Sequence, residues 1–232
     1  NGFRPSAYKK RALSLDPLFV PPPHDWDDTN WYDRDVFKYW VDFTDSWNFQ
    51  FPSESTYFVD GSNHALSSAN ERIAKGEQEG IALAEKIKSG EISLKDGEFI
   101  KLVGHSMGAA HAVGMAKGLI DQGVSPKIIK LFLFAPHQPN QIPAIEGVTM
   151  LQAGRNSDEV SSSGFLPTVT NSKHRPIDNA DWVVLPDRED AEYGGHVIQS
   201  FTTEEFKDAA PEVFQFLIDA GYINPVGSLI EQ

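Results

Sequence analysis

The chain has 232 residues, enough to bury a hydrophobic core in one α/β domain, and its 40% apolar and 23% charged residues are ordinary values for a globular protein. Its formal net charge of -13 argues against nucleic acid as a partner, because binding phosphates requires a basic surface. The absence of cysteine excludes disulfides, thiolate metal sites and cysteine nucleophiles. No apolar run approaches the roughly 20 residues that would cross a bilayer.

The first 54 residues differ in composition from the rest. Prolines occupy positions 21–23, and aromatic side chains interleaved with aspartates crowd the stretch from Trp26 to Phe51. This stretch is either an amphipathic cover on the core or an apolar flap that contacts substrate, and the sequence leaves both interpretations open. We therefore predict an aromatic-rich extension, 1–54, packed on a second unit, 55–232. Because Asn1 has no preceding Met, we expect a processed chain.

From residue 55 onward, strand and helix patterns alternate. Strands are predicted at 55–59, 99–103, 128–134, 148–151 and 182–185. Helices are predicted at about 67–88, at 107–122 and, with Pro211 in the first turn, up to Gly221. Thr202 and Glu205 have the spacing of a capping box. The alternation predicts an α/β fold with a mainly parallel sheet and helices on both faces.

A candidate nucleophile lies in the pentapeptide Gly-His-Ser-Met-Gly, residues 104–108. An apolar strand precedes it and a helix rich in small residues follows, which is the setting of a nucleophile elbow. Such a turn strains the serine, and only glycines two residues away let the strand and the helix approach. Ser106 is therefore the predicted nucleophile, and a noncatalytic glycine-rich turn is the alternative.

A serine nucleophile needs a histidine base that is oriented by an acid, in the chain order serine, acid, histidine. Asp158 follows the strand at 148–151 and is the predicted acid, with Glu159 as second choice. His196, after two glycines, is the predicted base, because the cations beside His174 would depress the basicity of that imidazole.

Further residues are predicted to surround this group. The N–H of Met107 is the first predicted oxyanion-hole donor, and Ser62 supplies the second from a turn that Gly61 permits. A simple β-turn is the alternative at 60–63. His137 follows the strand at 128–134 and is predicted to line the substrate site. The remaining histidines, His105 and His111, are predicted to pack or to support the site.

These residues resemble the α/β-hydrolase superfamily, and within it the class 3 (fungal-type) lipases. The resemblance rests on the elbow, on the oxyanion loop after an earlier strand, and on the segment Asn-Ser-Asp-Glu-Val, residues 156–160, that carries Asp158. It covers roughly residues 55–200 and implies an α/β-hydrolase fold. Two positions depart from the pattern: Ala109 replaces the second elbow glycine, and Asp60 replaces the usual arginine. Asp60 leaves the substrate class open.

A weaker resemblance links the chain to the lipase-like C-terminal domains of bacterial Rhs-type polymorphic toxins. It rests on His-Ser-Met-Gly-Ala-Ala-His at 105–111 and Ala-Pro-His-Gln-Pro at 135–139. This resemblance implies an inhibitory immunity protein as a partner, and a chain that is secreted or cut from a larger bacterial protein. The compartment is not identified by the sequence.

The predicted function is hydrolysis of a carboxylic ester through an acyl-serine intermediate, as in a lipase or phospholipase. An amidase or thioesterase could use the same residues, and a silent domain used for binding is the alternative outside enzymes. The expected partners are a small-molecule or lipid ester and, peripherally, a lipid surface. No cofactor and no metal are expected, because no histidine spacing suits a metal and no phosphate-binding loop is present.

Overall fold

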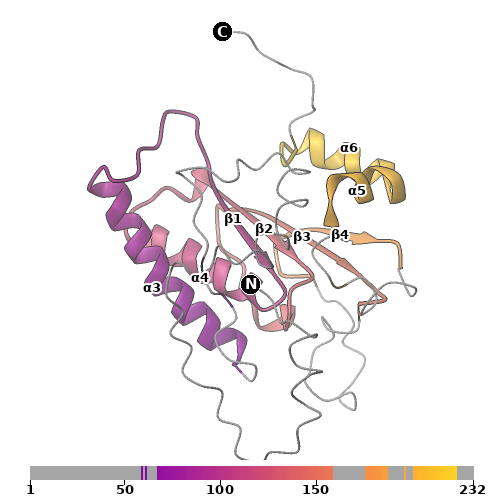
Figure 1. Ribbon diagram of the computed structural model, residues 1–232, viewed down its shortest axis with the longest axis horizontal. Helices are drawn as coiled ribbons and strands as arrows, with labels where there is room; N and C mark the ends of the chain where they lie inside the picture. The colour runs from indigo at the N-terminus through magenta and orange to yellow at the C-terminus, as the bar shows by residue number, and fades with distance from the viewer. Residues whose placement is uncertain are drawn as a thin grey trace, which may run out of the picture.

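A computed structural model of the 232-residue chain describes residues 59, 61, 67–158, 176–187, 196 and 201–223. Its centre is a four-stranded parallel sheet in the order β1-β2-β3-β4 (Figure 1). The strands are β1 (Ile100–His105), β2 (Ile129–Phe134), β3 (Thr149–Arg155) and β4 (Asp181–Leu185). The helices are α3 (Ala69–Lys88), α4 (Gly108–Asp121), α5 (Thr203–Ala209) and α6 (Pro211–Asp219), with short 3-10 turns at Pro126–Ile128 and Pro139–Gln141.

One face of the sheet packs against α3 and α4. Side chains of β2 alternate, so that Ile129, Leu131 and Leu133 belong to the core on this face, together with Val113 and Leu119 of α4. Helix α3 begins with a complete capping box, in which Ser68 and Glu71 bond each other's main chain. Two lysines in its last turn, Lys86 and Lys88, interact favourably with the negative end of the helix dipole.

Helices α3 and α4 approach closely because four glycines line their crossing. A Cβ at Gly76 would lie 2.1 Å from the carbonyl oxygen of His111, and one at Gly80 would lie 2.2 Å from that of Met115. The reciprocal pair, Gly114 and Gly118, would each place a Cβ 2.1 Å from a carbonyl oxygen of α3. No side chain fits at such distances. The crossing therefore seats α4, and the turn at its start, firmly against α3.

The opposite face of the sheet packs against α5 and α6. Phe132 and Phe134 of β2 share this core with Phe206 of α5 and Leu217 of α6. Thr202 caps α5 by accepting a hydrogen bond from the Glu205 N–H, and Pro211 occupies the first turn of α6. Helices thus cover both faces of the parallel sheet, which confirms the predicted α/β arrangement for the described residues.

The predicted elements match the structure with small shifts. β3 extends to Arg155, past the predicted end at 151, since residues 152–155 continue the hydrogen-bonded ladder with β2 and β4. Of the predicted strand at 55–59 only Val59 is described, and it is not in a strand. The extension 1–54 lies outside the described residues, so the predicted division into 1–54 and 55–232 stays a prediction. None of the described helices is long and apolar enough to cross a membrane.

Candidate active site

Ser106 occupies a strained turn between β1 and α4. Its φ of 55° lies in the left-handed region, which a non-glycine residue adopts only where its surroundings hold it there. The Ser106 N–H donates to the Phe134 carbonyl at 2.9 Å, and the Ser106 carbonyl accepts from the N–H of His137 at 3.1 Å. The same carbonyl accepts from the Ala109 N–H at 3.2 Å. The main chain of Ser106 is thus tied to β2 and to α4.

The glycine two residues before the serine has the steric role predicted for it. A Cβ on Gly104 would lie 2.6 Å from both the Cα of Ala109 and the carbonyl oxygen of Gly108. β1 therefore runs directly against the start of α4, and Ala109, fully buried, fits where the resemblance leads one to expect a glycine. Strand, strained serine and helix together form the geometry of a nucleophile elbow.

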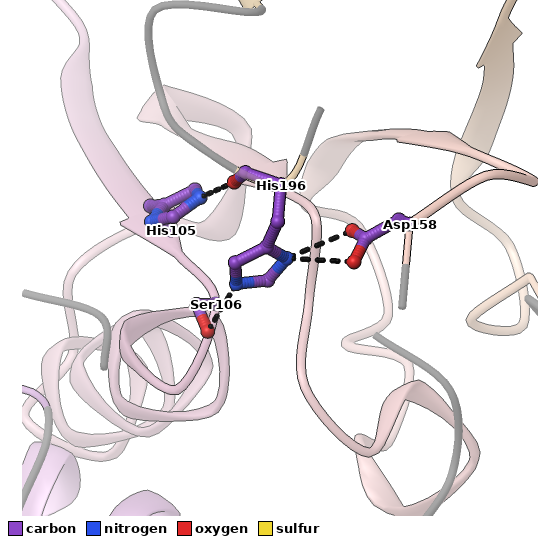
Figure 2. A network of polar contacts seen from close by, with 4 residues as sticks. All are labelled: His105, Ser106, Asp158 and His196. Atoms are coloured by element: carbon purple, nitrogen blue, oxygen red, sulfur yellow. Dashed lines mark hydrogen bonds and ion pairs between the residues drawn. The ribbon is translucent and has the colours of Figure 1, made fainter. Parts of the chain in front are cut away.

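The structure brings Ser106, His196 and Asp158 into one hydrogen-bonded chain (Figure 2). His196 Nε2 lies 2.9 Å from Ser106 Oγ. On the other side of the ring, Nδ1 lies 2.9 Å from Asp158 Oδ1 and 2.8 Å from Oδ2. All three residues are buried, with 0%, 2% and 3% of the surface of Ser106, His196 and Asp158 exposed. These are the three residues that the sequence predicts as nucleophile, base and acid.

The hydrogen-bonding groups fix where the proton of His196 sits. An ionised carboxylate only accepts hydrogen bonds, so Nδ1 carries the proton and donates it to Asp158. Nε2 then presents its lone pair to the Ser106 hydroxyl, which donates to it. In this tautomer Nε2 of His196 can accept the proton of the Ser106 hydroxyl.

The end of β3 is held by a buried arginine that sequence reasoning missed. The Asp158 N–H donates to the Arg155 carbonyl at 3.2 Å, so the acid sits one turn beyond this residue. The Arg155 guanidinium donates to the Pro186 carbonyl, just past β4, and at 3.1 Å to Glu205 of α5. The predicted strand ends at residue 151, so no pattern in the sequence places Arg155 within it. Arg155 ties together three elements that meet beside Asp158.

His137 lies beside the same site, as its predicted role requires. It follows a tight turn after β2 in which the non-glycine residues Ala135 and Gln138 have φ values of 44° and 59°. Burial and the neighbouring Arg72 guanidinium lower the pKa of His137 to about 4, and the positive form of His196 contributes in the same direction. His137 is half-buried and neutral at neutral pH.

Arg72 of α3 is a second buried cation that sequence reasoning missed. It is fully buried, and burial lowers the pKa of its guanidinium to about 10. Nη1 donates to the Ser67 carbonyl at 2.6 Å, while Nη2 donates to Gln138 Oε1 at 2.9 Å and lies 3.4 Å from His137 Nδ1. Residue 72 falls on the same helical stripe as Ala69 and Ile73, and this spacing could have marked it as inward-facing.

The two remaining described histidines have different surroundings. His105, the last residue of β1, places its Nε2 at 2.6 Å from the main-chain oxygen of His196. His111 of α4 instead pairs through Nε2 with Glu79 of α3 at 2.8 Å. Burial is the main cause of a His105 pKa well below its usual range. His105 therefore belongs to the Ser106 site, while His111 belongs to the crossing of α3 and α4.

The predicted oxyanion donors are described only in part. Met107 is buried and forms the N-cap of α4, whose start carries the positive end of the helix dipole. Gly61 packs against this start, since a Cβ on it would lie 2.9 Å from the Cα of Gly108 and 3.1 Å from the Cβ of His111. Its φ lies outside the left-handed region, so Gly61 is needed for close approach and not for a turn of that kind. Ser62, like the alternatives Glu159 and His174, lies outside the described residues.

Two surface cavities lie where β4 meets α6. One, of about 320 Å³, is lined by residues that include Asn156, Asp187 and Val213. The other, of about 410 Å³, includes Trp182, Val184 and Phe216. Neither is lined by Ser106, His196 or Asp158. Among the described residues, no group of three or more histidines and carboxylates could hold a metal ion.

Comparison with known proteins adds no relative. No protein-family model, no curated protein and no solved structure matches the chain.

Proposed function

We propose that the protein is a serine hydrolase of the α/β-hydrolase type, which cleaves carboxylic esters through an acyl-serine intermediate. The observation that carries this proposal is the buried chain from Ser106 Oγ through His196 to Asp158, with the serine in a left-handed turn between β1 and α4. A domain used only for binding has no need of a base within hydrogen-bonding distance of a strained serine. The location of all three residues beyond the carboxyl ends of parallel strands also supports it.

In the proposed reaction, Ser106 Oγ attacks the carbonyl carbon of the ester while its proton passes to Nε2 of His196. The carbonyl oxygen gains the negative charge, which the N–H groups of Met107 and Ser62 would stabilise. When the tetrahedral intermediate collapses, the bond to the alcohol breaks and His196 gives the proton to the departing oxygen. Water then attacks the acyl-serine with the same base, releasing the acid and restoring Ser106.

The proposed substrate class is an ester with an acyl chain, as in a lipase or phospholipase. Support comes from the resemblance to class 3 lipases and from the aromatic residues between Trp26 and Phe51. Each methylene that a substrate buries in the enzyme adds about 0.8 kcal/mol to the free energy of binding, so an acyl-binding enzyme discriminates strongly between chain lengths. An enzyme that acts on small polar esters would show no such dependence of kcat/KM on acyl length.

A panel of p-nitrophenyl esters of increasing acyl length, together with a phospholipid, tests the proposal. We expect Ser106→Ala to lower kcat/KM by roughly 10³-fold or more, because the nucleophile is lost while oxyanion stabilisation and binding remain. Ser125→Ala removes an exposed serine before the Pro126–Ile128 turn and serves as the matched control. Turnover in Ser106→Ala equal to that of the control would refute the proposed nucleophile.

A further inference from the structure

His105 contacts the main chain of His196, and this contact has a defined direction. The distance from His105 Nε2 to the His196 carbonyl oxygen is 2.6 Å (Figure 2). A carbonyl oxygen can only accept a hydrogen bond, so Nε2 must carry the proton and donate it. His105 Nε2 is therefore protonated and donates to the main chain of His196.

We propose that His105 is a positioning residue, which fixes the main chain of His196 so that its imidazole stays within reach of Ser106. The inference rests on the proposed function and adds to it a residue outside the three reacting groups. His105 does not touch the reacting atoms. It acts through the backbone of the base.

The place of His105 in the sheet explains why it is suited to this role. It is the last residue of β1 and pairs in register with Phe134 of β2, so its main chain is fixed by the parallel ladder. Only 1% of its surface is exposed. Because His105 is also covalently joined to Ser106, one rigid strand end carries both the nucleophile and the donor that holds the base. The strand end is thus connected to Ser106 by a peptide bond and to His196 by a hydrogen bond, and the two connections together set the distance between these residues.

A neutral donor is needed at this position for an electrostatic reason. The ring centroids of His105 and His196 are 5.0 Å apart. When His196 takes the proton of Ser106 it becomes positive, and a second positive charge at that distance would oppose the step. Burial lowers the pKa of His105 and so keeps it uncharged. A lysine or arginine could hold the carbonyl but would penalise the imidazolium.

Two substitutions of His105 distinguish the effect of losing its hydrogen-bond donor from the effect of altering its packing, and so test the proposal. His105→Gln keeps an N–H donor near the position of Nε2, His105→Leu removes it, and Leu119→Ala destabilises the core at the far end of α4 as a matched control. Steady-state hydrolysis of p-nitrophenyl butyrate gives kcat and KM for each variant. We expect His105→Leu to lower kcat by about 10- to 100-fold with KM nearly unchanged, because a small displacement of the base slows chemistry more than binding.

The controls decide between positioning and packing. We expect His105→Gln to recover kcat to within about threefold of wild type, and Leu119→Ala to leave kcat unchanged while lowering Tm. A wild-type kcat in His105→Leu would overturn the proposal. A folded His105→Gln variant whose kcat is tenfold or more below wild type would also overturn it, because an N–H donor at this position would then not be enough to position His196. This comparison holds even if His105→Leu does not fold.

Nuclear magnetic resonance of ¹⁵N-histidine-labelled protein tests the contact without any substrate. We expect His105 to be protonated at Nε2, and the His196 ring signals to broaden or split in His105→Leu but not in Leu119→Ala. A His105 protonated at Nδ1, or unaltered His196 signals in His105→Leu, would overturn the positioning role. A wild-type protein that hydrolyses no ester yet gives the expected spectra would instead count against the proposed function alone.

Discussion

Replacing Asp158 by asparagine changes one atom and should reverse the tautomer of the base. In the folded protein both carboxylate oxygens lie within 2.9 Å of His196 Nδ1 and accept its proton. The asparagine side chain can place an NH₂ group there, which donates instead of accepting. Nδ1 would then keep its lone pair and the proton would move to Nε2, facing Ser106 Oγ 2.9 Å away. A protonated Nε2 cannot take the serine proton.

The expected loss in kcat is on the order of 10⁴-fold, as for triads in which this exchange forces the wrong tautomer. At about 1.4 kcal/mol for each factor of ten, this corresponds to roughly 5.5 kcal/mol of transition-state stabilisation. The assay is p-nitrophenyl ester hydrolysis at neutral pH, with thermal unfolding measured in parallel to show that Asp158→Asn is folded.

Asp187→Asn is the matched control for Asp158→Asn. Asp187 Oδ1 accepts the Ser157 N–H at 2.9 Å, and the amide oxygen of asparagine can keep this bond. We expect the control to retain kcat within about threefold. If Asp158→Asn keeps more than a tenth of wild-type kcat while Glu159→Gln is inactive, the acid is Glu159 and not Asp158.

Three further predictions concern stability and are measured by urea unfolding. Gly114→Ala should lower the free energy of unfolding by about 1–3 kcal/mol despite the better helix propensity of alanine, because its Cβ would lie 2.1 Å from the Ile73 carbonyl oxygen; unchanged stability would show that α3 and α4 separate freely. Arg72→Met should lower the free energy of unfolding by about 3 kcal/mol, because the Ser67 carbonyl and the Gln138 side chain lose their buried donor. Unchanged stability in Arg72→Met would contradict this prediction. Histidine has a pKa of 6.5 in the unfolded chain, whereas the pKa of His137 in the folded protein is about 4. The unfolded chain therefore binds a proton first as the pH falls from 6.5 to 4, and the free energy of unfolding should decrease. At pH 5 the contribution of His137 to this decrease should be about 2 kcal/mol. His137→Gln should flatten that part of the pH dependence, and an unchanged slope would exclude His137 as its source.

Local signals in the sequence were enough to predict most of the described fold. The apolar run in β2 and the small residues of α4 each have one dominant pattern, so their boundaries shift by one or two residues at most. The grouping of Ser106, Asp158 and His196 is predicted from their order in the chain, from the strand that precedes Asp158 and from the two glycines before His196. No local signal extends β3 to Arg155, because that length depends on pairing with β2 and β4.

Interactions between distant elements were beyond sequence reasoning. Charged side chains are usually placed on surfaces, so Arg72 and Arg155 are not expected inside, although the Nη atoms of each donate to carbonyl or side-chain oxygens. The small residues after the elbow, Gly114 among them, are predicted to let the helix approach the sheet, whereas Gly114 packs against Ile73 of α3. Gly76 likewise faces α4, a contact that the sequence does not reveal. His105 was predicted to pack or to support the site, but its bond to the His196 carbonyl depends on two segments 91 positions apart.

Covalent labelling tests whether Ser106 is an activated nucleophile. A fluorophosphonate probe reacts with a serine only where a base activates it, and it requires no knowledge of the natural substrate. We expect one probe per wild-type chain, located by peptide mass spectrometry on Ser106, with labelling lost in Ser106→Ala and strongly slowed in His196→Ala. A wild-type chain that stays unlabelled, or a Ser106→Ala variant labelled to the same extent, would contradict this expectation.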